Sequence, residues 1–270
     1  MAFRMTIKGL DVSAILHPED KSTLDTLKKI PGFKGIVDKT ICSIMEKCAT
    51  VECLGDGVNV TDQSLPELDS LIKEACRVLD MEEAPNCSIN WFYHIGSFSI
   101  GEKSRRIVFP SGSIDLLSDD ELIFLIGHEL GHMKCGHKTY HMLTEAMYRP
   151  MVGTELESIM SLVKLPLLNW YRVSDYTADR IGLLCCQDID VAIKTMVKMA
   201  GLPQKYHNQI NINSFIQQGI DFKQNHSSFL EEIVKYISSN AACMPWLVLR
   251  AYELWEWYRS GEYGRILNKC

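Results

Sequence analysis

The chain has 270 residues, of which 46% are hydrophobic and 23% are charged, and its formal net charge is -6. This length and apolar content support one large buried core and exclude disorder, and the acidic balance without a long Lys/Arg stripe argues against nucleic acid as a partner. The 10 cysteines are too few for a disulfide scaffold, and the first residues lack the apolar run of a signal peptide, so we expect reduced, mostly buried thiols and a cytoplasmic location.

The first sixty residues predict helices, followed by a turn-rich domain boundary. Apolar side chains recur at helical spacing from residue 21 to residue 49, with an interruption at Pro31, which predicts two helices around a turn. The stretch LGDGVNVTDQSLP at residues 54–66 is rich in turn-forming residues. We therefore predict an N-terminal helical appendage over residues 1–60 and a main domain over residues 61–270.

The main domain is expected to begin with a helix and a small sheet. Ser64 and Glu67 have the spacing of a capping box, so a helix should start at Ser64. The segments CSINWFYHI at 87–95 and RRIVFP at 105–110 are rich in β-branched and aromatic residues, and turn-forming residues lie between them. They predict a small antiparallel sheet, and everything after Ser113 should be helical.

The next helix contains an unusual set of polar residues. Ser118 and Glu121 again have capping-box spacing, which predicts a helix start. His128 and His132 then lie at i and i+4, one turn apart on one face, which suits two ligands of a tetrahedral metal ion. Glu129 is offset around the helix, where it could take a proton from water at the metal. The alternative is a set of tolerated polar side chains, but the apolar flank implies burial, which is costly without a cation.

A second helix is predicted to complete the metal site. A catalytic zinc held by two imidazoles needs one more protein ligand, commonly a carboxylate. Asp175 and Asp179 are spaced i and i+4 in the helical segment 169–187, so they share a face. We predict that Asp175 is the third ligand and that Asp179 accepts a hydrogen bond from one ligand imidazole and orients it. The alternative is an exposed acidic face paired with Arg172 and Arg180.

No segment predicts a membrane span. Residues 151–173 contain several charged residues and Pro166, so we expect helices around a break at the proline. The last amphipathic helix contains Trp246, Trp255 and Trp257, which could dock on a membrane surface or a partner, although packing against the body is the commoner use of such a stripe. We therefore expect no transmembrane segment and at most a peripheral membrane contact.

Two motifs together resemble those of a known family. GHELGHMKCGH at 127–137 and RVSDYTADRIGLLCCQD at 172–188 are similar to the zinc metallopeptidases of the HtpX-like and CaaX-prenyl-endopeptidase group, whose pattern is HExGHxxxxH followed by SExxAD. The resemblance extends more weakly from about Leu65 to Leu267, and the soluble members match best. It implies a mainly helical α+β, zincin-like fold with the HExxH helix and a small antiparallel sheet, one Zn²⁺ per chain, and a peptide or protein substrate.

Several positions bear on how far the resemblance holds. Asp175 replaces the usual Glu and is one methylene shorter, so the second helix must approach closer or the zinc must shift. The family's His-Pro and later Arg, which steady an oxyanion, correspond to Met244, Pro245 and Arg250, so only Arg250 keeps that implied catalytic role. Loss of one oxyanion donor typically costs about 10²–10³ in turnover. His137 matches the family pattern but faces elsewhere on the helix, so we expect it to support a ligand or the helix end.

The segment GSFSIG differs from the family's Asn-Ala at the strand where a substrate aligns, which predicts an unusual substrate choice. An extended peptide is expected to add as a strand along this edge. The predicted substrate-binding residues are Ser97, Phe98, Ser99 and Ile100.

Two functions of different classes follow. The first is a soluble zinc-dependent endopeptidase in which His128, His132 and Asp175 hold Zn²⁺ and Glu129 moves the proton of the attacking water. The second is a catalytically weakened, metal-binding pseudoprotease that captures a protein partner through the same groove, which Asp175 and Met244 support.

Overall fold

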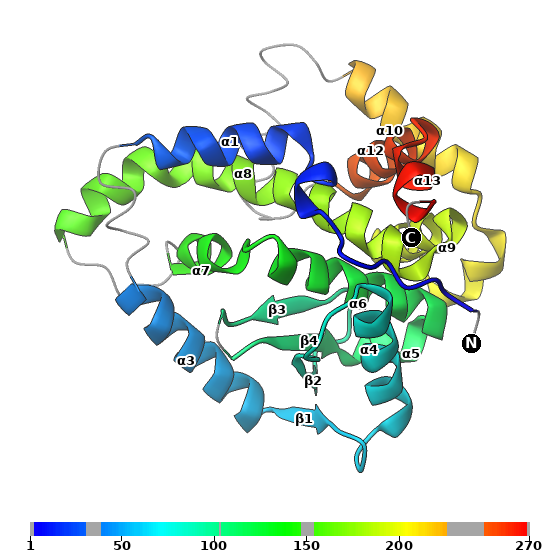
Figure 1. The fold of residues 1–270 in the computed structure, drawn as a ribbon, viewed down its shortest axis with the longest axis horizontal. Helices are drawn as coiled ribbons and strands as arrows, with labels where there is room; N and C mark the ends of the chain where they lie inside the picture. Colours follow the sequence, from blue (N-terminus) through cyan, green and yellow to red (C-terminus); the bar gives the residue numbers. More distant parts are fainter. Residues whose placement is uncertain (1–2, 31–38, 103, 147–153, 226–245, 269–270) are drawn as a thin grey trace.

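The predicted α+β, mainly helical fold is confirmed. The computed structural model describes residues 3–30, 39–102, 104–146, 154–225 and 246–268. Four layers follow one another from top to bottom in Figure 1: α1 (Pro18–Lys28), α8 (Thr154–Cys186), α6 (Asp119–Lys134) and a small sheet. The other helices in the described residues are α3 (Lys39–Gly55), α4 (Pro66–Val78), α5 (Ser111–Leu116), α7 (Lys138–Ala146), α9 (Ile189–Met199), α10 (Ile212–Asn225), α12 (Leu247–Arg259) and α13 (Glu262–Leu267), with short 3₁₀ turns at Val12–Ala14 and Gln204–Gln209.

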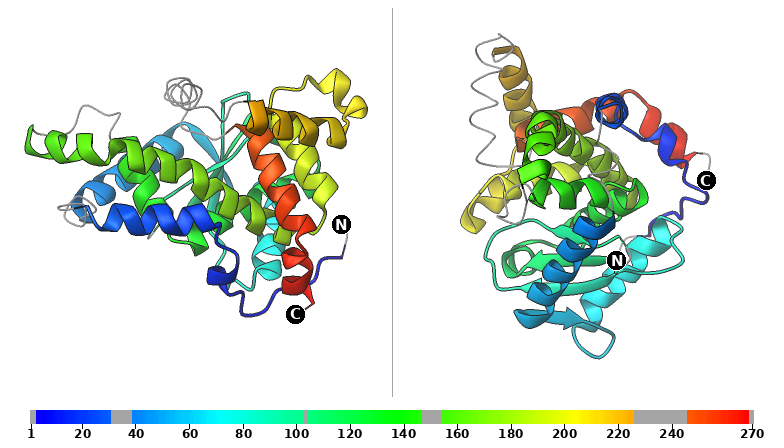
Figure 2. Two further views of the ribbon diagram at one scale, coloured as in Figure 1. Left: turned by 90° about the horizontal axis from the view of Figure 1, so that it is seen from above. Right: turned by 90° about the vertical axis from the view of Figure 1, so that its left-hand side faces the viewer.

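The C-terminal helices pack together beside the central pair. α9, α10, α12 and α13 gather at one end of α8, as Figures 1 and 2 show. Within the described part of the chain, no helix is both long enough and apolar enough to cross a membrane.

The sheet is mixed, whereas the sequence predicted an antiparallel one. Its strand order is β1 (Gly57–Val60), β2 (Asn86–Asn90), β4 (Arg106–Pro110) and β3 (Phe98–Ile100). The pairs β1–β2 and β4–β3 are antiparallel, but β2 and β4 run parallel. The reason is that the chain after β2 runs out to form the outer strand β3 before it returns as β4 between the two. β3 therefore lies at the edge of the sheet, next to α6.

The start of α6 is the predicted one. The Ser118 hydroxyl accepts a hydrogen bond from the Glu121 backbone N–H, and the Glu121 carboxylate accepts one from the Ser118 backbone N–H at 2.8 Å. This reciprocal capping box fixes where the helix begins. It therefore also fixes which face of α6 carries His128 and His132.

The capping box predicted at Ser64 is wrong. α4 begins at Pro66, and its N-cap is Leu65, whose φ of 65° is left-handed and which makes no side-chain capping bond. A residue that precedes proline is disfavoured in the helical region, so Leu65 cannot continue a helix started at Ser64. Ser64 instead closes a turn with Thr61 through two backbone hydrogen bonds.

The helix break predicted at Pro166 is also wrong. α8 runs without interruption from Thr154 to Cys186 with Pro166 inside it. An interior proline removes one backbone hydrogen bond and usually kinks a helix. Here α8 is held between α1 and α7, and Leu167 and Trp170 are fully buried among them. This packing offsets the lost bond.

The two central helices are in close contact through glycine. A Cβ placed on Gly127 of α6 would lie 2.4 Å from the Cys185 Cβ, and one on Gly182 of α8 would lie 2.9 Å from the Phe124 carbonyl oxygen. Real Cβ atoms do not come so close, so the helices could not keep this separation with any larger residue there. The close approach suits an aspartate, the shortest acidic side chain, as a ligand from α8.

The N-terminal residues share the main core. Ile7 and Ile15 are almost completely buried in the same cluster as Val60, Phe124 and Met196. α1 packs along α8 in a second cluster that includes Leu27 and Trp170, while β1 is part of the sheet. The boundary near residue 60 stays a prediction, and residues on both sides of it bury their apolar side chains together.

Candidate metal centre and active site

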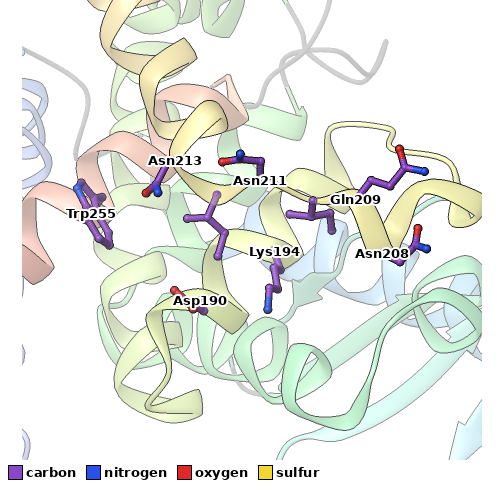
Figure 3. A pocket seen from close by; sticks show the side chains of 9 residues that line it. Asp190, Lys194, Asn208, Gln209, Asn211, Asn213 and Trp255 are labelled. Carbon is purple, nitrogen blue, oxygen red and sulfur yellow. The ribbon is translucent and has the colours of Figure 1, made fainter.

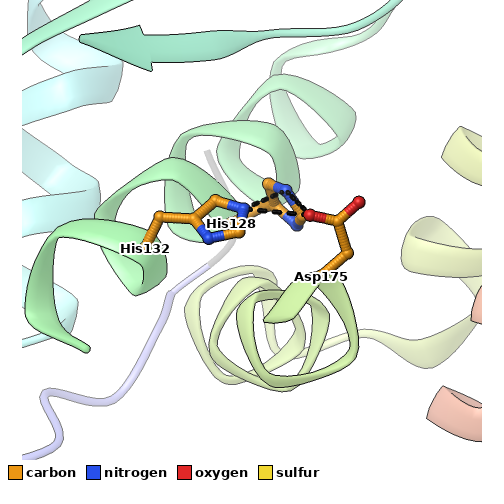
Figure 4. Close-up of side chains that lie close together, drawn as sticks. All are labelled: His128, His132 and Asp175. Carbon is orange, nitrogen blue, oxygen red and sulfur yellow. Dashed lines mark hydrogen bonds and ion pairs between the residues drawn. The ribbon is translucent and has the colours of Figure 1, made fainter. Parts of the chain in front are cut away.

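Three side chains from α6 and α8 converge on one buried point (Figure 4). The Nε2 atoms of His128 and His132 are 3.1 Å apart, and Asp175 Oδ1 is 3.2 Å from His132 Nε2 and 3.9 Å from His128 Nε2. Each residue is at most 5% exposed. Ligands at about 2.0–2.1 Å around a tetrahedral ion are separated by about 3.4 Å, so this set has the spacing of a zinc site.

An aspartate backs the first imidazole. His128 Nδ1 lies 2.9 Å from Asp179 Oδ1, and both groups are buried. Burial alone would raise the pKa of Asp179, but the Arg250 guanidinium and the His128 contact outweigh it and lower the pKa. The ionised carboxylate accepts the Nδ1–H of His128, which leaves the Nε2 lone pair directed at Asp175 and His132.

The second imidazole is backed by another histidine. His132 Nδ1 lies 3.0 Å from His137 Nδ1, and His137 Nε2 lies 3.2 Å from Asp20 Oδ2 of α1. Burial lowers the pKa of His132 well below its usual value, which favours the neutral ring that a metal needs. His137 thus contacts a candidate ligand and does not face the centre itself.

Arg250 of α12 lies behind the two aspartates. Its Nε and Nη2 donate to the two oxygens of Asp179 at 2.8 and 2.6 Å, and its Nη1 is 3.8 Å from Asp175 Oδ2. Asp175 Oδ2 and Arg250 Nη1 are buried without a hydrogen-bond partner among the described residues. Burial also raises the pKa of Asp175. A carboxylate so poorly satisfied by protein groups fits a role in holding a cation.

Glu129 is held from the sheet side. Its carboxylate accepts hydrogen bonds from the hydroxyls of Ser97, at 2.9 Å, and Ser99, while Lys138 Nζ lies 3.5 Å away. Burial alone would raise the pKa of Glu129, but Lys138, His128 and the two hydroxyls together lower it. The carboxylate is therefore ionised and fixed beside the three converging groups, as a proton acceptor must be.

The predicted substrate strand has two faces. Ser97 and Ser99 point toward Glu129, whereas Ile100 is buried in a cluster with Cys53 and Val108 on the other face, and Phe98 is 39% exposed. No described residue pairs with the outer edge of β3.

Two other predictions from the sequence concern an exposed acidic face and the positions Met244 and Pro245. The alternative of an exposed acidic face is wrong, because Asp175 is 3% and Asp179 0% exposed, and Arg180 donates to the backbone carbonyls of Ile15 and Leu16. Met244 and Pro245 lie outside the described residues. The sequence prediction missed Asp20 and Lys138, because no local spacing connects them with the HExxH helix.

A surface pocket of about 540 Å³ lies apart from this centre, between α9, α12 and the segment 208–213 (Figure 3). Its side chains include Asp190, Lys194 and Trp255 but no histidine or cysteine. This lining lacks the histidines of a catalytic zinc site, so we assign the chemistry to the buried centre.

A buried His-His-Asp centre with an adjacent glutamate, set between two helices and a sheet edge, defines the class of metal-dependent hydrolases. Comparison with known proteins identifies the family within this class. Residues 62–239 match the model of Peptidase family M48. The chain is 30% identical over 273 residues to the plastoglobule-localized metallopeptidase 48, chloroplastic, of Arabidopsis thaliana, across 98% of this chain and 78% of that protein. No solved structure matched.

The chain therefore belongs to peptidase family M48. The predicted resemblance to the HtpX-like group, which lies within this family, is confirmed. The protein is a metallopeptidase, and its substrate is a peptide or protein.

Proposed function

We propose that the protein is an endopeptidase that binds one Zn²⁺ per chain through His128, His132 and Asp175. The observation that supports this most is the convergence of two imidazole Nε2 atoms and one carboxylate oxygen at the spacing of a tetrahedral ion. Two histidines with one carboxylate and an open position favour zinc over other divalent ions. When bound, the ion activates water and polarises the scissile carbonyl as a Lewis acid.

Glu129 is the general base and later the general acid in this proposal. Its ionised carboxylate takes the proton of the attacking water and then delivers it to the leaving amine. Ser97 and Ser99 keep the carboxylate in place through their hydroxyls. The peptide adds along the outer edge of β3, next to Phe98 and Ile100, so that its scissile bond lies beside Glu129.

Arg250 has a positioning role in this proposal. The sequence resemblance implied an oxyanion-stabilising role, but the guanidinium makes two hydrogen bonds to Asp179 and approaches Asp175. These contacts favour a group that keeps Asp179 ionised and orients both aspartates behind the proposed ligands.

The test is cleavage of a diverse peptide library by the zinc-loaded wild type and by Glu129→Gln. We expect Glu129→Gln to bind one zinc per chain and to lose at least about 10²-fold in turnover, in line with the loss of a general base. Equal and negligible turnover in both would contradict the proposal and support the pseudoprotease alternative. That alternative is not favoured, because His128, His132 and Asp175 converge at one point and the Glu129 carboxylate is held beside them.

The location of the protein in the cell needs a test of its own. We keep the cytoplasmic prediction for this chain, while the printed name of the Arabidopsis relative places that protein in chloroplast plastoglobules. Fractionation of cells that express the tagged full-length protein would decide, since recovery with an organelle would contradict the prediction.

A further inference from the structure

Asp20 is a buried carboxylate that the proposed mechanism does not use. It lies in α1 and is 1% exposed. Its two oxygens accept hydrogen bonds from Trp170 Nε1 at 2.8 Å and Thr177 Oγ1 at 2.6 Å, both from α8. These two bonds connect α1 with α8. A third contact, to His137 Nε2 at 3.2 Å, connects Asp20 with the metal centre.

One arrangement of hydrogens satisfies all of these contacts. An ionised carboxylate only accepts, so His137 Nε2 carries the hydrogen that faces Asp20. With that hydrogen on Nε2, the Nδ1 of His137 can accept a hydrogen bond from His132 Nδ1, 3.0 Å away. His132 therefore has its hydrogen on Nδ1, and its Nε2 lone pair faces His128 and Asp175. Each candidate ligand ring is thus supported by a carboxylate. Asp179 contacts His128 directly, and Asp20 contacts His132 through His137.

We propose that Asp20, acting through His137, is a positioning residue that holds His132 in the tautomer and orientation needed for metal binding. The proposal rests on the proposed function, since it concerns the same metal site. It makes α1 part of the metal centre, because the residue that orients one ligand comes from the N-terminal segment. Groups behind a ligand histidine typically change metal affinity by about 10–100-fold when they are removed.

The test measures zinc affinity of the metal-free, full-length protein by competition with a chromophoric chelator. We expect Asp20→Asn and His137→Gln each to weaken zinc binding by about 10–100-fold. The double variant should bind no more weakly than His137→Gln alone, because both substitutions break one chain of contacts. Thr177→Val is the matched control: it removes another donor to Asp20 but leaves the contact with His137, so its affinity should stay within about twofold of wild type.

A second readout separates positioning from general destabilisation. The ring ¹⁵N resonances of the metal-free protein report the tautomer of His132, which we expect to be Nδ1–H in wild type and in Thr177→Val and to change in Asp20→Asn. An unchanged tautomer with unchanged affinity in Asp20→Asn would overturn the proposal, as would independent, additive losses in the double variant.

The test depends neither on the folding of Asp20→Asn nor on peptide cleavage. If Asp20→Asn lacks a cooperative thermal transition, His137→Gln compared with Thr177→Val decides by the same two readouts, and wild-type values in His137→Gln would overturn the proposal. Neither readout requires peptide cleavage. If wild type bound zinc but cut no peptide, the endopeptidase proposal would fail while this one stood.

Discussion

At the scale of single residues, the site shows how a buried glutamate is kept ready to accept a proton. Glu129 is 2% exposed, and an unpartnered carboxylate in that position would be costly. Two serine hydroxyls and the Lys138 ammonium satisfy it. The serines come from the edge strand where the peptide is proposed to add, so the base and the substrate strand are linked by hydrogen bonds.

The first prediction concerns these serines. Ser99→Ala removes one hydrogen bond to a charged acceptor, worth about 1.5–3 kcal/mol, and should lower kcat by roughly tenfold or more. Zinc affinity should not change, because Ser99 contacts no candidate ligand. Steady-state cleavage assays and zinc titrations check the two parts.

Ser88→Ala provides the matched control. Ser88 is fully buried in β2 of the same sheet, and its hydroxyl has no hydrogen-bond partner among the described residues. It should leave kcat unchanged. Equal kcat values for Ser99→Ala and Ser88→Ala would refute the assigned role of Ser99.

How much of the site could be predicted differs from residue to residue. His128, His132, Asp175 and Asp179 stand at i and i+4 within single helices, and helix geometry alone tells which side chains share a face. Asp20 has no such local relation to its partners, since it lies 157 positions from Thr177 and meets His137 only because α1 docks on α8. Contacts of this kind depend on tertiary packing, which no local pattern encodes.

At the scale of elements, the close packing of α6 and α8 positions the proposed third ligand. Glycines at the contact let the helix backbones approach, and Asp175 reaches His132 from α8. Local patterns predicted the capping of α6 but failed at Leu65, where the following proline overrides a capping box, and at Pro166, where packing overrides a break.

The second prediction concerns this helix contact. A methyl group at Gly127 would lie 2.4 Å from the Cys185 Cβ, so Gly127→Ala should push the helices apart. We expect a loss of about 1–3 kcal/mol in unfolding free energy from overpacking and a weaker zinc affinity. Chemical denaturation and zinc titration measure the two effects.

Gly264→Ala is the control for this variant, because a Cβ at Gly264 in α13 meets nothing within 4 Å. It should not destabilise the protein. Adding Asp175→Glu to Gly127→Ala should restore part of the zinc affinity, since the longer side chain spans a wider gap. Wild-type stability and affinity in Gly127→Ala would show that the contact is not tight.

The third prediction concerns Glu253 of α12, which links two other helices. It lies 3.5 Å from His17 Nε2 at the start of α1 and accepts a hydrogen bond from Lys223 of α10 at 2.8 Å. Burial alone would raise the pKa of Glu253, but His17 and Lys223 outweigh it and lower the pKa to about 2. A carboxylate whose pKa is lower in the folded state contributes stability above its unfolded pKa, and that contribution is lost as the pH falls toward the folded pKa.

Between pH 4.5 and 2, the unfolding free energy of wild type should therefore fall more steeply than that of Glu253→Gln. Urea unfolding at a series of pH values measures this. Glu256→Gln, at an exposed position of the same helix, should keep the wild-type slope. Parallel curves for wild type and Glu253→Gln would contradict the prediction.

At the scale of the whole molecule, the metal centre joins segments from the entire chain. Asp20 belongs to α1, the proposed ligands to α6 and α8, and Arg250 to α12. The mainly helical fold was predictable because helices such as α4 have strong apolar periodicity and α6 begins at a capping box. The parallel pairing of β2 with β4 was not predictable, because strand order depends on the path between the strands.

The fourth prediction is that metal removal destabilises the whole fold. A ligand at 100 times its Kd adds about 2.7 kcal/mol of stability, which in a protein of this size raises Tm by roughly 5–10 °C. Chelation should therefore lower Tm by this amount, and added zinc should restore it.

Calorimetry of wild type and His132→Ala with and without chelator makes the test. His132→Ala lacks one candidate ligand and should show little or no shift, while Glu129→Gln should shift as wild type does. A chelator effect of equal size in His132→Ala would place the metal elsewhere.

The late position of Arg250 in the sequence bears on when the metal centre can form during translation. This guanidinium is translated 122 positions after His128, and until it emerges from the ribosome the aspartates beside the HExxH helix lack the cation that neutralises them. We therefore expect a nascent chain that lacks α12 to be inactive as a peptidase. Ribosome-bound chains that stop short of α12 should retain no zinc, and tight retention by them would show that the earlier segments assemble the site unaided.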